Sequence, residues 1–133
     1  MFFHSLEKAT SLYEEVYEIL KKNSATSSQQ MTEVIGKLAT LYRQQNRLDL
    51  AEPFQVQFAE LKERALGPHH LDVARALNNL AVMYSMQDEY AKALPTYDRA
   101  LKAYRYNFPD DHPTVSTVVQ NRQLAAHILS QLS

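Results

Sequence analysis

The sequence contains no cysteine, and only two of its 133 residues are glycine. Without cysteine there is no disulfide framework, no thiolate nucleophile and no cysteine-containing zinc knuckle, so nothing requires an oxidising compartment. We therefore expect a cytoplasmic protein. The scarcity of glycine, together with an apolar content of 45%, favours helices over a strand-rich fold with many sharp turns. The composition thus predicts an all-α globular protein.

The chain also lacks a surplus of charge of one sign and long apolar runs. Its 14 basic and 15 acidic residues give a net charge of -1, whereas binding to nucleic acid or an anionic membrane calls for a clustered basic surplus. No segment approaches the roughly 20 apolar residues that span a bilayer, and residues 1–10 do not resemble a signal peptide. We therefore expect no nucleic-acid partner and no membrane partner.

Motifs for catalysis are missing as well. The sequence has no glycine-rich phosphate loop, no nucleophile elbow and no H-E-x-x-H zinc motif. Carboxylates such as Glu14, Glu15 and Glu18 fall on polar faces of helical patterns, where solvation accounts for them. The sequence therefore predicts a protein that is not an enzyme and needs no cofactor.

An internal repeat organises what is present. When the sequence is shifted by 42 positions, many of its landmark residues coincide. These residues form the pairs Tyr42 and Tyr84, Ala51 and Ala93, Pro53 and Pro95, His70 and His112, and Val73 and Val115. Apolar residues recur at helical spacing in two series within each period. Each period is therefore predicted to be a pair of helices.

The turns between these helices carry their own signals. Gly67 is suited to a left-handed helix stop between the two pairs. Asn46 and Asp88 are equivalent under the shift and precede the second helix of each pair. We expect their side chains to cap the amides that begin those helices.

Six helices follow from these boundaries, over residues 3–22, 28–44, 48–65, 71–86, 89–106 and 113–131. The first aligns with the second helices of the pairs. The last aligns with the first helices but is more polar, which suits a solvent-facing cap. We therefore predict a single domain, 1–133, made of a half repeat (1–22), two full repeats (28–65 and 70–106) and a capping helix (112–131).

The second pair resembles the tetratricopeptide repeat (TPR) pattern W-x2-L-G-x2-Y followed by A-x3-F and A. Its matching residues are Leu77, Leu80, Ala81, Tyr84, Ala93, Tyr97 and Ala100. In the first pair, Gln55 and Phe58 replace the expected aromatic and small residue. We therefore expect the second helix of the first pair to pack differently.

The longer period and the phrase GPHHLDVARALNNLAVMY resemble the kinesin light chain variety of TPR, since the standard repeat has about 34 residues. The resemblance implies a right-handed superhelix of six antiparallel helices, with two full repeats and a half repeat at each end. It further implies an adaptor or scaffold that binds a peptide or helix of a partner protein in a concave groove.

In such proteins the first helix of each pair lines the groove. The resemblance places the peptide-binding residues of this chain at Lys37, Thr40, Arg43, Arg75, Asn78, Asn79, Val82, Gln120 and Asn121. Ser85, Met86 and Leu124 are expected on the same surface.

Two of these expectations have plain alternatives. The resemblance implies that the carboxamide of Asn79 binds a peptide backbone, but Asn79 would also suit a bond to a neighbouring helix. Lys37, Arg43 and Arg75 would make the groove basic and favour a peptide with acidic residues, unless they are ordinary solvated charges.

A second function remains open at the level of sequence. Met1, Phe2 and Phe3 begin a helix that has no preceding partner in the repeat pattern. An exposed apolar end of this kind would drive self-association, giving a structural or regulatory TPR domain that forms a homodimer through its N-terminal helix.

The histidines raise the question of a metal site. His69, His70 and His112 fall in equivalent turns that lie one repeat apart, so they are not expected to converge on one ion. We expect His70 and His112 to lie at helix starts and to bond locally, with no metal bound.

Overall fold

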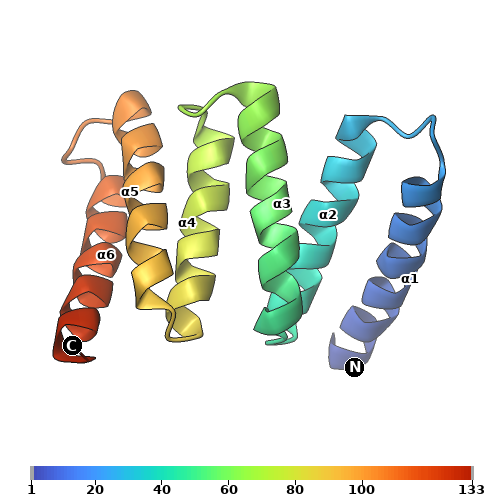
Figure 1. Cartoon of the computed structure of the whole chain (residues 1–133), viewed down its shortest axis with the longest axis horizontal. Helices are drawn as coiled ribbons and strands as arrows, with labels where there is room; N and C mark the ends of the chain where they lie inside the picture. The colour runs from blue at the N-terminus through green and yellow to red at the C-terminus, as the bar shows by residue number, and fades with distance from the viewer. Residues whose placement is uncertain (1, 133) are drawn as a thin grey trace. The chain divides into compact units, whose positions relative to one another are not determined.

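The computed structural model describes residues 2–132, apart from the side chain of Phe3, and in that range it contains six helices and no strand (Figure 1). They are α1 (Phe2–Lys22), α2 (Ser28–Gln44), α3 (Leu48–Leu66), α4 (Leu71–Met86), α5 (Tyr90–Asn107) and α6 (Pro113–Leu132). None of these six is long and apolar enough to cross a membrane. The all-α prediction is confirmed, and every predicted helix is present.

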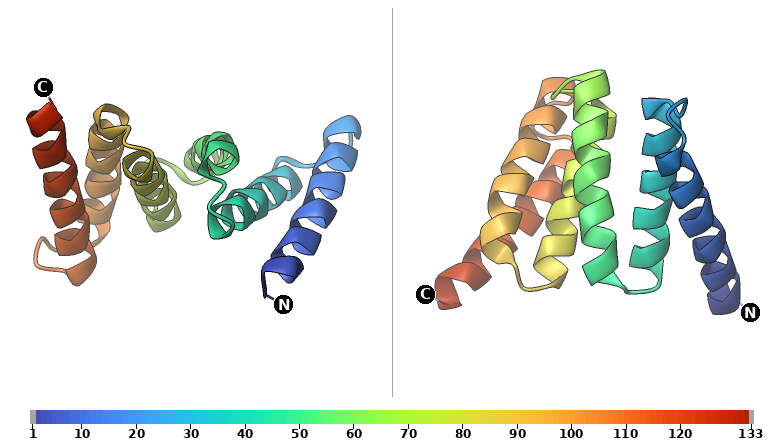
Figure 2. Two further views of the ribbon diagram at one scale, coloured as in Figure 1. Left: turned by 90° about the horizontal axis from the view of Figure 1, so that it is seen from below. Right: turned by 45° about the vertical axis from the view of Figure 1, so that its right-hand side comes forward.

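The chain divides into two compact units, Met1–Leu61 and Lys62–Ser133, so the boundary falls inside α3. In the first unit α1 packs on α2, and in the second α4 packs on α5 and α5 on α6. Successive helices within each unit run in opposite directions, and Figure 2 shows the same alternation from two further sides. Each unit is therefore built from antiparallel neighbours.

The short turns after α2 and α4 are formed by a backbone motif. Asn46 and Asp88 adopt the left-handed conformation, with φ of 57° and 61°. The Asp88 amide donates to the carbonyl of Ser85, and the Glu89 amide donates to that of Tyr84 (3.1 and 2.8 Å). This is a Schellman motif, which satisfies the last carbonyls of a helix. Residues 42–47 repeat the same pattern.

The expected capping role of Asn46 and Asp88 is therefore wrong. The N-cap of α5 is Glu89, which makes no side-chain capping bond. Short polar side chains suit two positions, the N-cap and the left-handed residue that ends a helix, because Asn and Asp tolerate a positive φ better than most residues. Sequence alone did not separate these roles. Gly67 does end α3 as predicted, with φ of 88°.

The second helix of the first repeat packs differently, as expected. Gln55 is buried there, and aromatic bulk comes instead from Phe54, whose ring lies 5.3 Å from that of Tyr17 and 5.8 Å from that of Tyr42. Phe58 lies so close to Gly36 of α2 that a Cβ on this glycine would be 2.6 Å from the Phe58 ring. A large residue on α3 is therefore matched by the smallest residue on α2.

Candidate functional site

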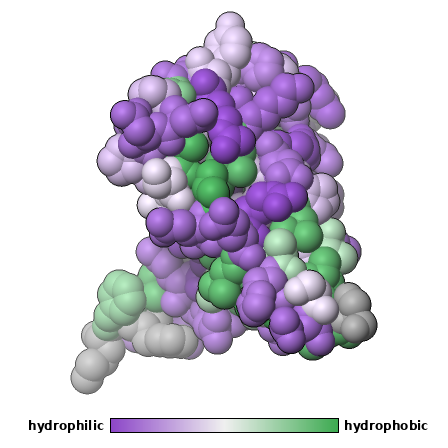
Figure 3. Space-filling view, turned by 90° about the vertical axis from the view of Figure 1, so that its left-hand side faces the viewer, coloured by the Kyte–Doolittle hydropathy of each residue, from purple (hydrophilic) through white to green (hydrophobic). Residues whose placement is uncertain are grey.

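A hollow of about 290 Å³ opens among α4, α5 and α6 in the second unit. It is lined by Val82, Ser85, Met86, Tyr90, Tyr97, Asn121, Leu124, Ala125 and Ile128. None of these side chains is charged, and most are apolar. In the space-filling view of Figure 3, apolar patches interrupt a mainly hydrophilic surface. Such a hollow suits one apolar side chain of a ligand better than a charged one.

Two buried polar atoms on α4 lack hydrogen-bond partners, and one of them belongs to Ser85, which lines this hollow. The Oγ of Ser85 and the Oδ1 of Asn78 are buried, and neither has a hydrogen-bond partner among the described residues. Asn78, Val82 and Ser85 are spaced by four and three residues, so they lie along one stripe of α4. An unpaired buried polar group costs about 1–3 kcal/mol. A ligand that supplied hydrogen bonds here would remove part of that cost.

Asn79 is exposed on α4, and its side chain forms no hydrogen bond with another described residue. The alternative in which Asn79 bonds a neighbouring helix is therefore not observed. Its carboxamide, which has both a donor and an acceptor, is thus available to a peptide group.

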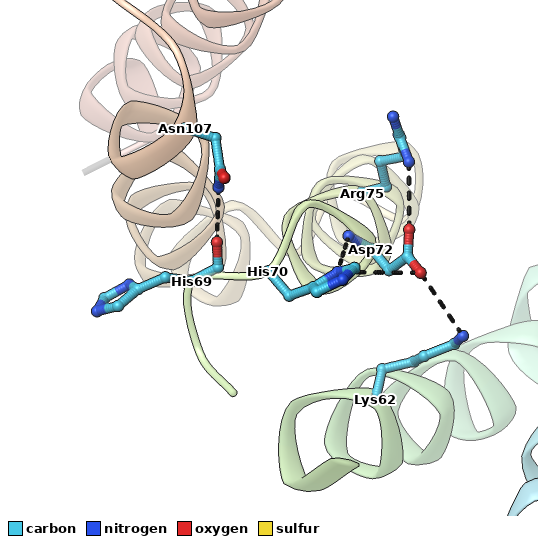
Figure 4. A network of polar contacts seen from close by, with 6 residues as sticks. All are labelled: Lys62, His69, His70, Asp72, Arg75 and Asn107. Atoms are coloured by element: carbon cyan, nitrogen blue, oxygen red, sulfur yellow. Dashed lines mark hydrogen bonds and ion pairs between the residues drawn. The ribbon is translucent and has the colours of Figure 1, made fainter. Parts of the chain in front are cut away.

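Arg75 lies at the N-terminal end of α4 within a polar network (Figure 4). Its Nη1 is 3.2 Å from Oδ1 of Asp72, and the Nζ of Lys62 on α3 is 3.9 Å from the other carboxylate oxygen. Asp72 therefore neutralises part of the positive charge predicted for this surface. Arg75 remains exposed, so an acidic ligand would have to compete with Asp72 for it.

The remaining predicted site residues lie on α2 and α6. Lys37, Thr40 and Arg43 belong to α2 in the first unit, where the Oγ1 of Thr40 donates to the carbonyl of Gly36 (3.0 Å). Lys37 and Arg43 are exposed, and neither forms an ion pair within residues 2–132. Gln120 is exposed on α6, while the neighbouring Asn121 lines the hollow. The structure thus brings Val82 and Asn121 together.

Some lining residues were not predicted. Tyr90 and Tyr97 come from α5, which the repeat pattern assigns to packing, and Ala125 and Ile128 come from the C-terminal half of α6. Tyr97 does serve the core, since it is almost fully buried, yet its ring also reaches the hollow. Periodicity identifies the buried face of one helix but does not show which edge of a buried ring borders a cavity.

The histidines bond locally, as predicted. The Nδ1 of His70 accepts a hydrogen bond from the Asp72 amide (3.0 Å), and the Nδ1 of His112 accepts one from the Thr114 amide (3.1 Å). His69 stacks on Tyr106, with ring centroids 4.6 Å apart. In the part of the chain that the structure describes, no three His, Asp or Glu residues are grouped so that they could hold a metal ion.

Comparison with known proteins gives two findings. A family model described as tetratricopeptide repeat matches residues 27–105. Among solved structures, the crystal structure of BtubC (BKLC) from P. vanneervenii is similar, with a TM-score of 0.74 and 23% sequence identity. The match covers 92% of this chain and 48% of that one, so this chain spans about half the length of that protein. At this identity the likeness concerns the fold.

Proposed function

Because this chain belongs to the tetratricopeptide repeat family, in the long-period form that resembles kinesin light chains, we propose that it is an adaptor or scaffold module that binds a peptide segment of a partner protein on α4 and α6. Tetratricopeptide repeats mediate protein–protein interaction and typically serve as scaffolds without catalysis.

The hollow beside α6 is the observation that carries this proposal. Its uncharged lining is suited to an apolar side chain of the ligand, and burying a side chain the size of leucine or phenylalanine contributes about 1.5–3 kcal/mol. Asn79 would hold the ligand backbone through its carboxamide. Ser85 and Asn78 supply acceptors that are unsatisfied in the free protein.

Acidic residues in the ligand are a further part of the proposal. They would lie toward the N-terminal end of α4, where Arg75 is exposed. Lys37 and Arg43 offer similar charges on α2 in the first unit. Contacts of this kind are screened by salt, so binding to an acidic ligand should weaken as ionic strength rises, whereas the apolar contact should not.

Affinity capture from cell extract, followed by identification of the bound proteins and peptide mapping, tests the proposal. Leu124→Glu places a charge at the rim of the hollow, and Leu132→Glu is its matched control, because both residues lie on α6 and are exposed (60% and 70%), but only Leu124 lines the hollow. We expect partners to be lost with Leu124→Glu and with Asn79→Ala plus Arg75→Glu, and retained with Leu132→Glu. Equal capture by all variants would place the binding surface elsewhere.

A specific observation favours self-association as a second candidate. Leu12, Val16 and Ile19 of α1 are 62%, 38% and 65% exposed, and their spacing of four and three residues aligns them along one stripe. Leu6 and Thr10, which are buried, lie on another face of the same helix. Phe2 is exposed too, whereas Met1 and the side chain of Phe3 lie outside the described residues.

Light scattering over a range of protein concentrations separates the two candidates. Self-association through α1 predicts a dimer that is lost with Leu12→Glu plus Ile19→Glu and kept with Leu124→Glu. A monomer at every concentration would remove this candidate and leave the peptide-binding proposal unaffected.

A further inference from the structure

The helices α4 and α6 begin with the same unusual cap. In both, a histidine precedes the first helical residue and its Nδ1 accepts the amide hydrogen of the second residue that follows, Asp72 for His70 and Thr114 for His112. Ser, Thr, Asn and Asp usually fill this position, and their oxygens accept hydrogen bonds near neutral pH and below it. Histidine differs, because Nδ1 accepts only while it carries no proton.

The two caps differ in the charges around them. The Nδ1 of His70 lies 3.9 Å from a carboxylate oxygen of Asp72. That carboxylate also faces Lys62 of α3 and Arg75 of α4 (Figure 4). Protonated His70 would therefore lose the amide contact but would lie beside a carboxylate, which it would share with Lys62 and Arg75.

Among the described residues, His112 has no such carboxylate partner. Its ring stacks on Phe108 at the end of α5, with centroids 3.9 Å apart and an angle of 4° between the planes. The acids next to it in sequence are Asp110, which pairs with Arg105 of α5 (3.1 Å), and the exposed Asp111. No carboxylate of a described residue forms an ion pair with His112.

We propose that His112 is an acid-labile cap, which makes the start of α6 sensitive to pH, whereas His70 is the acid-tolerant form of the same cap. Protonation of His112 turns the acceptor Nδ1 into a donor that faces the Thr114 amide. It also places a positive charge at the N-terminal end of a helix, where the helix dipole already disfavours cations. Imidazole rings ordinarily change charge between about pH 5 and 8, which sets the pH range for a test of the cap.

The first turn of α6 is a sensitive place for such a change. Val115, which is 1% exposed, lies in that turn, so opening the turn would bring a core side chain into water. The helix continues to Asn121, Leu124 and Ile128 in the hollow. If the peptide-binding proposal holds, mild acid would therefore weaken ligand binding; the acid response of α6 itself does not depend on that proposal.

Urea unfolding of the full chain at about pH 7.5 and about pH 5.5 tests the inference for the wild type, His112→Asn and His70→Asn. The side-chain oxygen of asparagine accepts the hydrogen bond from the backbone amide at both pH values, so each variant keeps a cap but loses its imidazole. We expect the unfolding equilibrium constant of the wild type to rise on acidification by about fivefold more than that of His112→Asn, which corresponds to the loss of one cap. His70→Asn should respond like the wild type.

An equal acid response in the wild type and His112→Asn would overturn the inference. A measurement on the wild type alone gives a second check, because amide resonances report each cap separately. As the pH falls, the exchange protection of the Thr114 amide should decrease, after correction for the intrinsic rate, more than that of the Asp72 amide. Equal changes at the two amides would contradict the distinction between the caps.

Discussion

The close contact between Gly36 and Phe58 predicts that the effect of Gly36→Ala on stability depends on whether the Phe58 ring is present. Gly36 lies inside α2, where alanine is normally the better residue. A Cβ at this position would be 2.6 Å from Cε1 and 2.9 Å from Cδ1 of Phe58, closer than carbon atoms pack. In the second repeat the equivalent residues are Asn78 and Ala100, so the larger and smaller side chains are exchanged.

Two opposing terms set the magnitude for Gly36→Ala. Replacing glycine by alanine inside a helix stabilises by about 1 kcal/mol, because alanine loses less backbone entropy on folding. Forcing a methyl group against the Phe58 ring costs about 1–3 kcal/mol. The net change in the unfolding free energy is therefore expected to lie between about zero and a loss of 2 kcal/mol.

In the Phe58→Ala background the ring is gone, and the same Gly36→Ala substitution should then stabilise by about 1 kcal/mol. Urea denaturation of the wild type, both single variants and the double variant gives the coupling energy between the two positions. We expect a coupling of about 1–3 kcal/mol. If Gly36→Ala changed the unfolding free energy equally in both backgrounds, the close packing of this pair would be refuted.

Four other predictions concern stability. Ala81→Leu should overpack the fully buried surface of α4 and cost about 1–3 kcal/mol, seen as a lower melting temperature. Pro95→Ala should stabilise by about 1–3 kcal/mol, measured by urea unfolding, because α5 continues through this exposed proline without its amide bond. Asp88→Gly should stabilise by up to about 1 kcal/mol and Asp88→Ala should destabilise in the same assay, since φ is positive there. Burial, together with the hydrogen bond that Tyr42 donates to Glu14, raises the pKa of Tyr42 from 10.0 to about 12. The protonated Tyr42 hydroxyl therefore stabilises the folded state below pH 10.0, and this stabilisation is lost as the pH rises toward 12. The unfolding free energy of Tyr42→Phe should not show this alkaline loss. If the wild type and Tyr42→Phe lost the same stability at alkaline pH, the prediction would be refuted.

Much of the fold was predictable because its signals are local. Helical spacing of apolar residues, a glycine at a helix end and prolines between helices act over a few residues, and the six helices end within one residue of the predicted positions. The histidine caps were predictable for the same reason. The roles of Asn46 and Asp88 were not, because the same short side chains suit the N-cap and the left-handed end of a helix.

The candidate site was predicted only in part. The family resemblance implied Val82 and Asn121 as site residues, and the structure places both at one hollow. The pairing of Arg75 with Asp72 joins residues three apart on one helix and is therefore local. The second apolar stripe on α1 became clear only from the structure, because it depends on which surfaces the neighbouring helix covers.

By itself, then, the sequence determined the number, length and order of the helices and the turns that join them, because those are set by neighbours along the chain. Only the tertiary structure decided that Phe58 fits against Gly36 and that Tyr90 and Tyr97 complete a hollow with α4 and α6. These outcomes depend on side-chain volume brought together from different helices, and packing is decided by shape in three dimensions rather than by spacing along one helix.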